Sequence, residues 1–301
     1  MRTGAVEWHL VTDGTFRLDG GAMFGVVPKP LWERKAAPDD RNRITLGTNC
    51  LLVRSNGSTV LVDVGLGRKD SPRFRDMYGV GDESSLVTSL AAHGVAPEDV
   101  DVVVCTHLHF DHAGGVTRLD EDGRATPVFP RARHLVQRDE LEDARNPSVR
   151  SAASYFPWNW DPLEAAGLLE VVHGEVDVVP GVRTKVMKGH IRALQGVAIE
   201  SGSEKAFYPS DSIPTTAHLP VPWVMGYDLY PLDTVAFKES FLPQAADEGW
   251  TVIFEHDPKV GAARIRRAGK GFEVEPVAPS AHVTPAPAPG PDEVPRGGER
   301  A

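Results

Sequence analysis

Cysteine is scarce in this chain, and long apolar runs are missing from it. Two cysteines, Cys50 and Cys105, occur among the 301 residues, and both sit inside apolar stretches. We expect a pair of buried, reduced thiols rather than a disulfide framework. No stretch approaches the roughly 20 consecutive apolar residues of a membrane span, and residues 1–8 lack the apolar core of a secretory signal. These absences predict a cytoplasmic protein with no membrane partner.

Basic residues are fewer than acidic ones. The chain has 32 Lys and Arg against 42 Asp and Glu, which gives a formal net charge of -10. A nucleic-acid partner requires a basic surface that neutralises phosphates, so this balance argues against nucleic-acid binding. A small, neutral or weakly charged substrate fits it better.

Large apolar side chains become rare at the C-terminal end. Residues 276–301 are dominated by Pro, Ala, Gly and scattered charges, a composition that cannot bury enough apolar surface to fold. The remaining residues are enough for one large domain or two small ones. We therefore predict a folded domain over residues 1–275 and a disordered tail over residues 276–301.

The rest of the chain has a β-rich pattern interrupted by helices. The clearest element is a hairpin, in which apolar runs at 50–53 and 59–62 flank Asn56-Gly57, the strongest short turn signal. Further elements are expected as a strand region over 6–18, a helix capped by Asp82 and running to residue 93, a buried strand over 100–105 and a helix over 232–248.

Two longer stretches carry aromatic side chains. Residues 19–46 form a Gly- and Pro-rich segment that predicts a lid, a binding loop or a plain surface excursion. Residues 139–167 predict a helical insertion that carries Tyr155 and Trp160.

One short segment concentrates side chains that bind metal ions. Residues 106–115 read Thr-His-Leu-His-Phe-Asp-His-Ala-Gly-Gly, directly after the predicted buried strand. His107 and His109 are two residues apart, so in an extended loop they project to one side and can share a metal ion. Asp111 and His112 can serve a second ion, and the glycines allow a tight turn beneath the site. Imidazole and carboxylate in this order predict a site for Zn²⁺ or a similar ion.

Further candidate ligands follow other predicted strands. His190 follows a strand over 182–187, Asp211 follows a strand over 206–209, and His256 follows a strand over 250–255. Because a layered α/β fold gathers strand ends along one edge, these side chains can converge with the segment at 107–112. We predict that all three are metal ligands.

The combined pattern of His-x-His-x-Asp-His, a distant Gly-His, a Ser-Asp after a strand and a late His resembles the metallo-β-lactamase superfamily over roughly residues 6–275. The resemblance implies the αββα sandwich, an α/β fold of two facing mixed sheets with helices outside and the metal site at the strand ends. Asp63 matches an acidic residue that orients the metal loop in this family. The implied ligands are His107, His109 and His190 for one ion, Asp111, His112 and His256 for the other, and Asp211 as the bridge between them.

The resemblance also implies a hydrolase with two divalent metal ions, Zn²⁺ in the first place, with Fe, Mn or Co as alternatives. In such enzymes a metal-bound hydroxide attacks a polarised carbonyl, and carboxylates such as Asp111 orient it. No Gly-x-Ser-x-Gly elbow occurs in the chain, so no serine nucleophile is expected.

Within the superfamily the chain is similar to the lactonase branch, which includes quorum-quenching acyl-homoserine lactonases. The likeness lies in the N-terminal excursion, in residues 107–115 and in the Phe-Glu-His-Asp ending at 254–257. We predict cleavage of an ester-like bond, above all a lactone, in a small substrate with an apolar chain or ring. The alternatives are a glyoxalase-II-like thioesterase, a phosphotriesterase and a mononuclear iron dioxygenase of the same fold. A metal-binding protein without turnover is least favoured, and a homodimer is left open.

Two positions depart from the lactonase pattern. Gly-His-Thr becomes Gly-His-Ile at 189–191, and Pro214 stands where the lactonases have a tyrosine. A donor aimed at the reacting oxygen strengthens catalysis, and Pro214 cannot donate. Among the polar residues that follow, His218 has the longest reach and can donate when neutral or charged. We therefore predict His218 as a catalytic residue beside Asp111.

Overall fold

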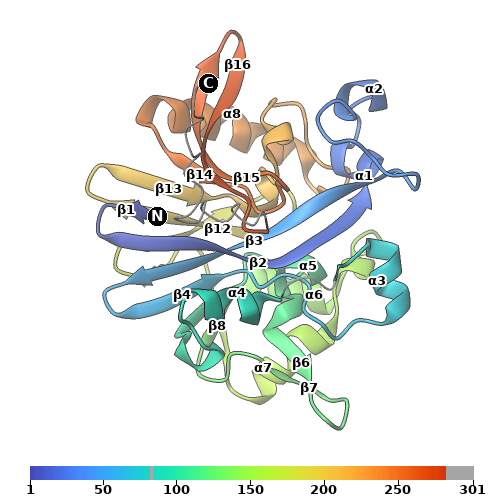
Figure 1. Cartoon of the computed structure of the whole chain (residues 1–301), viewed down its shortest axis with the longest axis vertical. Coiled ribbons are helices and arrows are strands. Elements are labelled where there is room, and N and C mark those ends of the chain that lie inside the picture. The colour runs from blue at the N-terminus through green and yellow to red at the C-terminus, as the bar shows by residue number, and fades with distance from the viewer. Residues whose placement is uncertain (82–84, 283–301) are drawn as a thin grey trace, which may run out of the picture.

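The computed structural model describes residues 1–81 and 85–282, which form two β-sheets packed face to face with helices on both outer sides (Figure 1). The first sheet has the strand order β1-β2-β3-β4-β5-β8-β9, and the second runs in sequence order from β10 to β16. The predicted αββα sandwich is thereby confirmed.

The elements have the following bounds. The first sheet contains β1 Arg2–Thr3, β2 Val6–Asp19, β3 Arg43–Ser55, β4 Ser58–Val62, β5 Val102–Val104, β8 Arg133–Gln137 and β9 Leu169–Val172. The second contains β10 Asp177–Val179, β11 Val182–Met187, β12 Leu194–Ser201, β13 Glu204–Tyr208, β14 Thr251–Ile253, β15 Val260–Ala268 and β16 Gly271–Pro279. A separate ribbon pairs β6 Thr117–Leu119 with β7 Ala125–Pro127. The α-helices are α1 Gly20–Phe24, α2 Lys29–Trp32, α3 Pro72–Tyr78, α4 Leu86–Ala92, α5 Phe110–Ala113, α6 Arg138–Arg145, α7 Asp161–Ala165 and α8 Pro231–Glu248.

Each sheet mixes antiparallel and parallel pairs. In the first sheet β1 to β4 are antiparallel neighbours, whereas β4, β5, β8 and β9 run parallel. In the second sheet only the pair of β13 and β14 is parallel among the strands described. Parallel neighbours end at the same edge of a sheet, so the loops that follow β5, β13 and β14 are brought together along one side of the sandwich.

The space between the sheets is filled by one apolar cluster. Leu51, Val62 and Val104 of the first sheet and Ile199 and Ile253 of the second belong to it, and all five are fully buried. Successive side chains of a strand point to opposite faces. The intervening residues of the first sheet therefore join a separate cluster with α4, α6 and α7, and α8 covers the outer face of the second sheet (Figure 1).

Several predicted elements are confirmed and some bounds are corrected. Asn56 and Gly57 both have positive φ, at 50° and 82°, as a two-residue hairpin turn requires. Asp82, the predicted helix cap, lies outside the described residues. The helix α4 begins at Leu86, and Ser85 caps it by accepting a hydrogen bond from the Thr88 backbone N–H at 3.2 Å.

The domain boundary predicted at residue 275 is wrong. Strand β16 pairs with β15 as far as Pro279, and the Ser280 hydroxyl donates to Asn49 Oδ1 at 2.6 Å. Two prolines are tolerated here because β16 is the edge strand of its sheet, where alternate N–H groups face away from the one neighbouring strand. The predicted disorder of residues 283–301 falls outside the described part of the chain.

Residues 19–46 form helices and buried contacts rather than a plain surface excursion. They contain α1 and α2, and Met23, Phe24 and Trp32 pack with Phe16 and Leu46 of the first sheet in a buried cluster. Figure 1 shows α1 and α2 at the end of the long strands β2 and β3. No helix within the described residues is both long and apolar enough to cross a membrane.

Candidate metal centre

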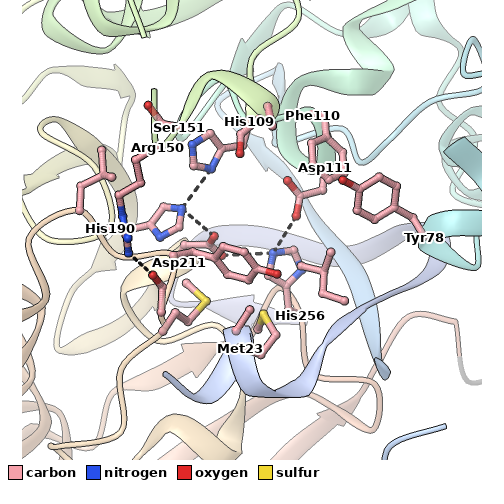
Figure 2. Close-up of a pocket in the computed structure, with 18 residues that line it drawn as sticks. Met23, Tyr78, His109, Phe110, Asp111, Arg150, Ser151, His190, Asp211 and His256 are labelled. Carbon is pink, nitrogen blue, oxygen red and sulfur yellow. Dashed lines mark hydrogen bonds and ion pairs between the residues drawn. The ribbon is translucent and has the colours of Figure 1, made fainter. Parts of the chain in front are cut away.

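The predicted ligands meet at one edge of the sandwich. Strand β5 leads into the first group of them, and β11, β13 and β14 of the other sheet each lead to one more. The seven side chains brought together are His107, His109, Asp111, His112, His190, Asp211 and His256. None is more than 9% exposed. Figure 2 shows five of them pointing toward one another at the floor of a pocket.

One group consists of His107, His109, His190 and Asp211. Nδ1 of His109 lies 3.1 Å from Nε2 of His107 and 3.1 Å from Nε2 of His190. Oδ2 of Asp211 lies 3.1 Å from the same His190 nitrogen. Zn–N bonds are 2.0–2.1 Å long, so two nitrogens on one tetrahedral ion are about 3.3 Å apart. The spacing of this group matches ligands around a shared ion.

A second group lies beside the first. Nε2 of His256 is 3.2 Å from Nε2 of His112 and 3.1 Å from Oδ1 of Asp211. Oδ2 of Asp111 is 3.7 Å from the His256 nitrogen and 3.8 Å from that of His112. Asp211 therefore presents one carboxylate oxygen to each group, which is the arrangement a bridging ligand needs.

Glu255 also lies near the second group, although no ligand role is predicted for it. Its Oε2 approaches Nδ1 of His112 at 2.9 Å, whereas Nε2 of His112 faces His256 and Asp211. Glu255 is therefore behind the imidazole ring rather than beside the metal-facing nitrogen. Asp111 fits the fourth position of this group better, although its oxygen is farther from the histidines.

The Nδ1 atoms of three of these histidines are held by other parts of the chain. Nδ1 of His112 is 3.0 Å from Asp63 Oδ2, Nδ1 of His190 is 3.0 Å from Asp228 Oδ1, and Nδ1 of His256 donates to the Gly47 carbonyl at 2.9 Å. A proton fixed on Nδ1 leaves Nε2 unprotonated and able to bind a metal ion.

One buried polar atom tests whether a metal ion fits. Oδ1 of Asp211 has no hydrogen-bond partner among the described residues, although it lies only 3.1 Å from Nε2 of His256. That geometry suits two ligands of one ion rather than a hydrogen bond. Burial, followed by the neighbouring imidazoles, holds the pKa of His107 and of His109 well below its usual range, so both rings stay neutral as ligands must. The donor set fits two divalent ions.

Asp63 holds the loop that carries the first ligands. It sits at the end of β4 with φ of 54° and accepts from the Thr106 backbone N–H and hydroxyl, both at 2.7 Å. The loop also needs its glycines: a Cβ on Gly114 would lie 2.1 Å from the Leu66 carbonyl oxygen. The expectation that Asp63 orients this loop agrees with these contacts.

The helical insertion supports His109 through residues that sequence reasoning missed. Glu140 on α6 is fully buried and accepts from the Leu108 backbone N–H at 2.8 Å and from the Tyr155 hydroxyl at 3.2 Å. The Tyr155 ring packs against the His109 ring, with centroids 4.9 Å apart. Burial raises the pKa of Glu140 to about 8. The sequence of α6 is mostly charged, so no local pattern distinguishes Glu140 from its neighbours.

His218 is placed differently from the prediction. Its Nε2 donates to the Met23 carbonyl at 2.9 Å, its Nδ1 lies 2.8 Å from the Thr215 hydroxyl, and its ring stacks on Phe24 at 4.7 Å. Burial lowers its pKa to about 4, so the ring is neutral and both nitrogens are engaged. His218 therefore joins α1 to the loop after β13 and does not line the pocket, which contradicts a role as donor to the substrate.

A pocket of about 340 Å³ opens over the metal-binding groups. Its apolar walls come from Leu18, Ala22, Met23, Phe110, Ala153, Met225 and Leu229. Tyr78, Tyr227 and Arg150 supply polar groups, and His109, Asp111, His190, Asp211 and His256 form the floor (Figure 2). A small molecule with an apolar portion fits this lining.

Comparisons with known proteins agree with this geometry. Residues 43–256 match the family model of the metallo-beta-lactamase superfamily. A probable metal-dependent hydrolase from Staphylococcus aureus is 33% identical, with a TM-score of 0.85 over 95% of this chain and 100% of that one. The dizinc quorum-quenching lactonase AidC is 24% identical, with a TM-score of 0.75 over 92% and 96% of the two chains, and shares the fold.

Curated relatives include lactonases. The N-acyl homoserine lactonase of Bacillus cereus is 28% identical over 171 residues, which are 53% of this chain and 61% of that protein. The lactonase AttM of Rhizobium radiobacter is 28% identical over 185 residues, 60% of this chain and 66% of that protein. The matched part thus spans less than two thirds of the Bacillus cereus protein. The family match covers more than half of the chain and agrees with the sandwich and its convergent ligands, so the chain belongs to the metallo-β-lactamase superfamily.

Proposed function

We propose that the chain is a hydrolase that uses two divalent metal ions, zinc in the first place, to open an ester-like bond, above all that of a lactone. The observation that carries the proposal is the position of Asp211, which offers one oxygen to each histidine group at the floor of an apolar pocket. The proposed ligands are His107, His109 and His190 for one ion, Asp111, His112 and His256 for the other, and Asp211 for both.

When bound, two such ions supply Lewis acidity and lower the pKa of coordinated water toward neutrality. The chain itself positions the reactants. Asp111 lies at the pocket floor, where its carboxylate can accept a hydrogen bond from the attacking water and hold it in line with the substrate carbonyl. The apolar walls exclude other water and bind the non-reacting part of the substrate.

The hydrogen-bond donor toward the reacting oxygen is a tyrosine in this proposal. Tyr227 and Tyr78 both line the pocket, and Pro214 and His218 do not. Burial raises the pKa of both phenols, so each stays protonated and can donate. Tyr227 directly precedes Asp228, whose carboxylate holds a proposed ligand, so we assign to Tyr227 the role predicted for His218.

The proposal has two further supports. Similar proteins are named as N-acyl homoserine lactonases, and the lactonase AidC is described as dizinc. The pocket lining is mainly apolar, which suits a small-molecule substrate with a chain or a ring.

A hydrolysis panel on metal-loaded protein tests the proposal. It contains lactones, thioesters, aryl esters, phosphotriesters and β-lactams. We expect the highest kcat/KM for lactones, and an increase of up to about fourfold per added CH₂ until the pocket is full, from about 0.8 kcal/mol per buried CH₂. Preference for glutathione thioesters or phosphotriesters, or no dependence on chain length, would contradict it.

A further inference from the structure

Arg150 is the one Arg or Lys side chain among the described residues that line the pocket. It comes from the loop after α6, and Figure 2 shows it on the same side of the pocket as His190, away from Tyr78. One of its terminal nitrogens donates to the carbonyl of Gly226, another lining residue. This contact fixes the position of the guanidinium at the pocket wall.

Arg150 has no carboxylate partner within residues 1–81 and 85–282. The acids of the neighbouring helix α6 are already engaged, because Glu142 and Asp143 lie 3.1 and 3.0 Å from nitrogens of Arg192. A guanidinium carries five N–H donors in a planar fork, and the Gly226 carbonyl uses only part of them. The others remain available to a ligand.

The charges around the pocket separate into two regions. Asp111 and Asp211 lie at the floor, where they disfavour an additional anion, and Arg150 lies on the wall. The lining also includes Met225, which precedes the Gly226 that Arg150 contacts, and Leu229, whose backbone N–H donates to the His190 carbonyl; both side chains suit a short apolar linker. A substrate with its ester at the floor and an anionic group on an arm would match all three regions.

We propose that Arg150 is a specificity-determining residue that selects lactone or ester substrates carrying a carboxylate on a short apolar arm. The guanidinium fork matches a carboxylate through two parallel hydrogen bonds, which a neutral amide or methyl group cannot reproduce. This inference rests on the proposed function for the position of the ester, and it adds a charged recognition group to that function.

The test compares two lactones with the same ring and the same arm length, one ending in a carboxylate and the other in a methyl group. The proteins are the metal-loaded wild type, Arg150→Gln, Arg150→Lys and the control Arg145→Gln. Arg145 is also near the end of α6 and is paired with Glu164 on the surface, so its loss changes the net charge equally without touching the pocket. We expect the wild type to prefer the carboxylate lactone.

Arg150→Gln should lower kcat/KM for the carboxylate lactone at least tenfold and change the neutral lactone less than threefold. Arg150→Lys should lie in between, and Arg145→Gln should match the wild type. Equal losses on both lactones, no loss on either, or a wild-type preference for the neutral lactone would overturn the inference and leave the hydrolase proposal intact.

A binding measurement separates the two proposals. The cyclic ether with the same carboxylate arm has no bond to hydrolyse, and its affinity and that of its methyl ester can be measured by calorimetry. If neither lactone is hydrolysed, the proposed function fails. The inference then stands when Arg150→Gln lowers the affinity for the carboxylate ether at least tenfold and leaves the affinity for its methyl ester unchanged. It is overturned when each of these two ligands binds to all variants with equal affinity.

Discussion

Oδ1 of Asp228 lies 3.0 Å from Nδ1 of His190, and Asp228 reaches it from a loop 38 residues further along the chain. The next residue of that loop, Leu229, donates its backbone N–H to the His190 carbonyl at 2.9 Å. The loop before α8 thus holds both the ring and the backbone of one proposed ligand. The Asp228 carboxylate keeps the proton on Nδ1 of His190 and turns Nε2 of that ring toward the metal-binding groups.

Replacing Asp228 by Asn should therefore weaken metal binding without removing a ligand. Carboxylates that orient ligand histidines contribute about 10- to 100-fold to metal affinity, and we expect a loss near tenfold for this variant. Competition with a chelator measures it. Asp247→Asn is the control, since Asp247 is an exposed carboxylate paired with Arg267. Equal affinities in all three proteins would contradict a role for Asp228.

Elemental analysis should find close to two equivalents of divalent metal in the wild type. His112→Ala removes a proposed ligand of the second ion only, because its Nε2 faces His256 and Asp211. We expect its content to fall to about one equivalent. One equivalent in the wild type, unchanged in His112→Ala, would instead indicate a mononuclear site and favour the dioxygenase alternative.

Tyr227→Phe should slow turnover while metal content stays at two equivalents. A lost donor to a developing oxyanion costs about 10²–10³ in rate in other enzymes, and we expect at least a tenfold lower kcat with little change in KM. Tyr230→Phe is the matched control, because Tyr230 does not line the pocket and instead packs under the Lys188 ammonium. If both variants turn over like the wild type, the metal ions act on the substrate without a phenol.

Two truncations should behave differently. Deleting residues 283–301 should leave the melting temperature and activity nearly unchanged, because their composition cannot support a core. Deleting residues 276–301 also removes the end of β16 and Ser280, whose partner Asn49 donates to the Phe254 and Asp257 carbonyls on either side of His256. We expect this second deletion to lower both melting temperature and metal content. A large loss from the shorter deletion would show that residues 283–301 contribute to stability.

Lys238 should make stability depend on pH. Its side chain is fully buried and donates to the Pro220 and Trp223 carbonyls, and burial lowers its pKa to about 7, with Asp228 opposing. The unfolded chain keeps the usual pKa near 10.4. Between about pH 7 and 10 the unfolded state binds the extra proton, so unfolding free energy should rise with pH, by up to about 1.4 kcal/mol per unit.

Urea unfolding at pH 7, 8 and 9 measures this slope. Lys238→Met should be less stable and should lack the contribution of Lys238 to the slope, whereas the exposed Lys259→Met should retain it. Parallel pH profiles for the wild type and Lys238→Met would show that Lys238 keeps an ordinary pKa in the folded protein.

The sequence predicted the fold and the ligand cluster because their signals are local. The segment from His107 to His112 carries four candidate ligands in six positions, and each later candidate follows an apolar run. Strand ends converge in any layered sheet, so proximity could be inferred without knowing the path of the chain. The Asn56-Gly57 turn was equally readable, since its backbone conformation depends on those two residues alone.

The rest depends on contacts that no local pattern encodes. Asp228 and Glu140 come from a loop and a helix whose distance to the site is set by the packing of the whole domain. The ability of His218 to donate predicts a catalytic role, but Met23 and Thr215 occupy both of its nitrogens. The composition of residues 276–301 predicts that the folded domain ends before Pro276. The domain continues through Pro279 because an edge strand accepts proline where a central strand does not.

The proposed ligand sets also affect how the two sheets are held together. Each set takes histidines from the loop after β5 in the first sheet and from the loops after β11 or β14 in the second. A bound ion would therefore cross-link the halves of the sandwich, in a chain whose two cysteines are both free. Free metal at about 1,000 times its Kd adds roughly 4 kcal/mol to the free energy of unfolding. Metal supply would thus govern how long the folded protein persists as well as how fast it reacts.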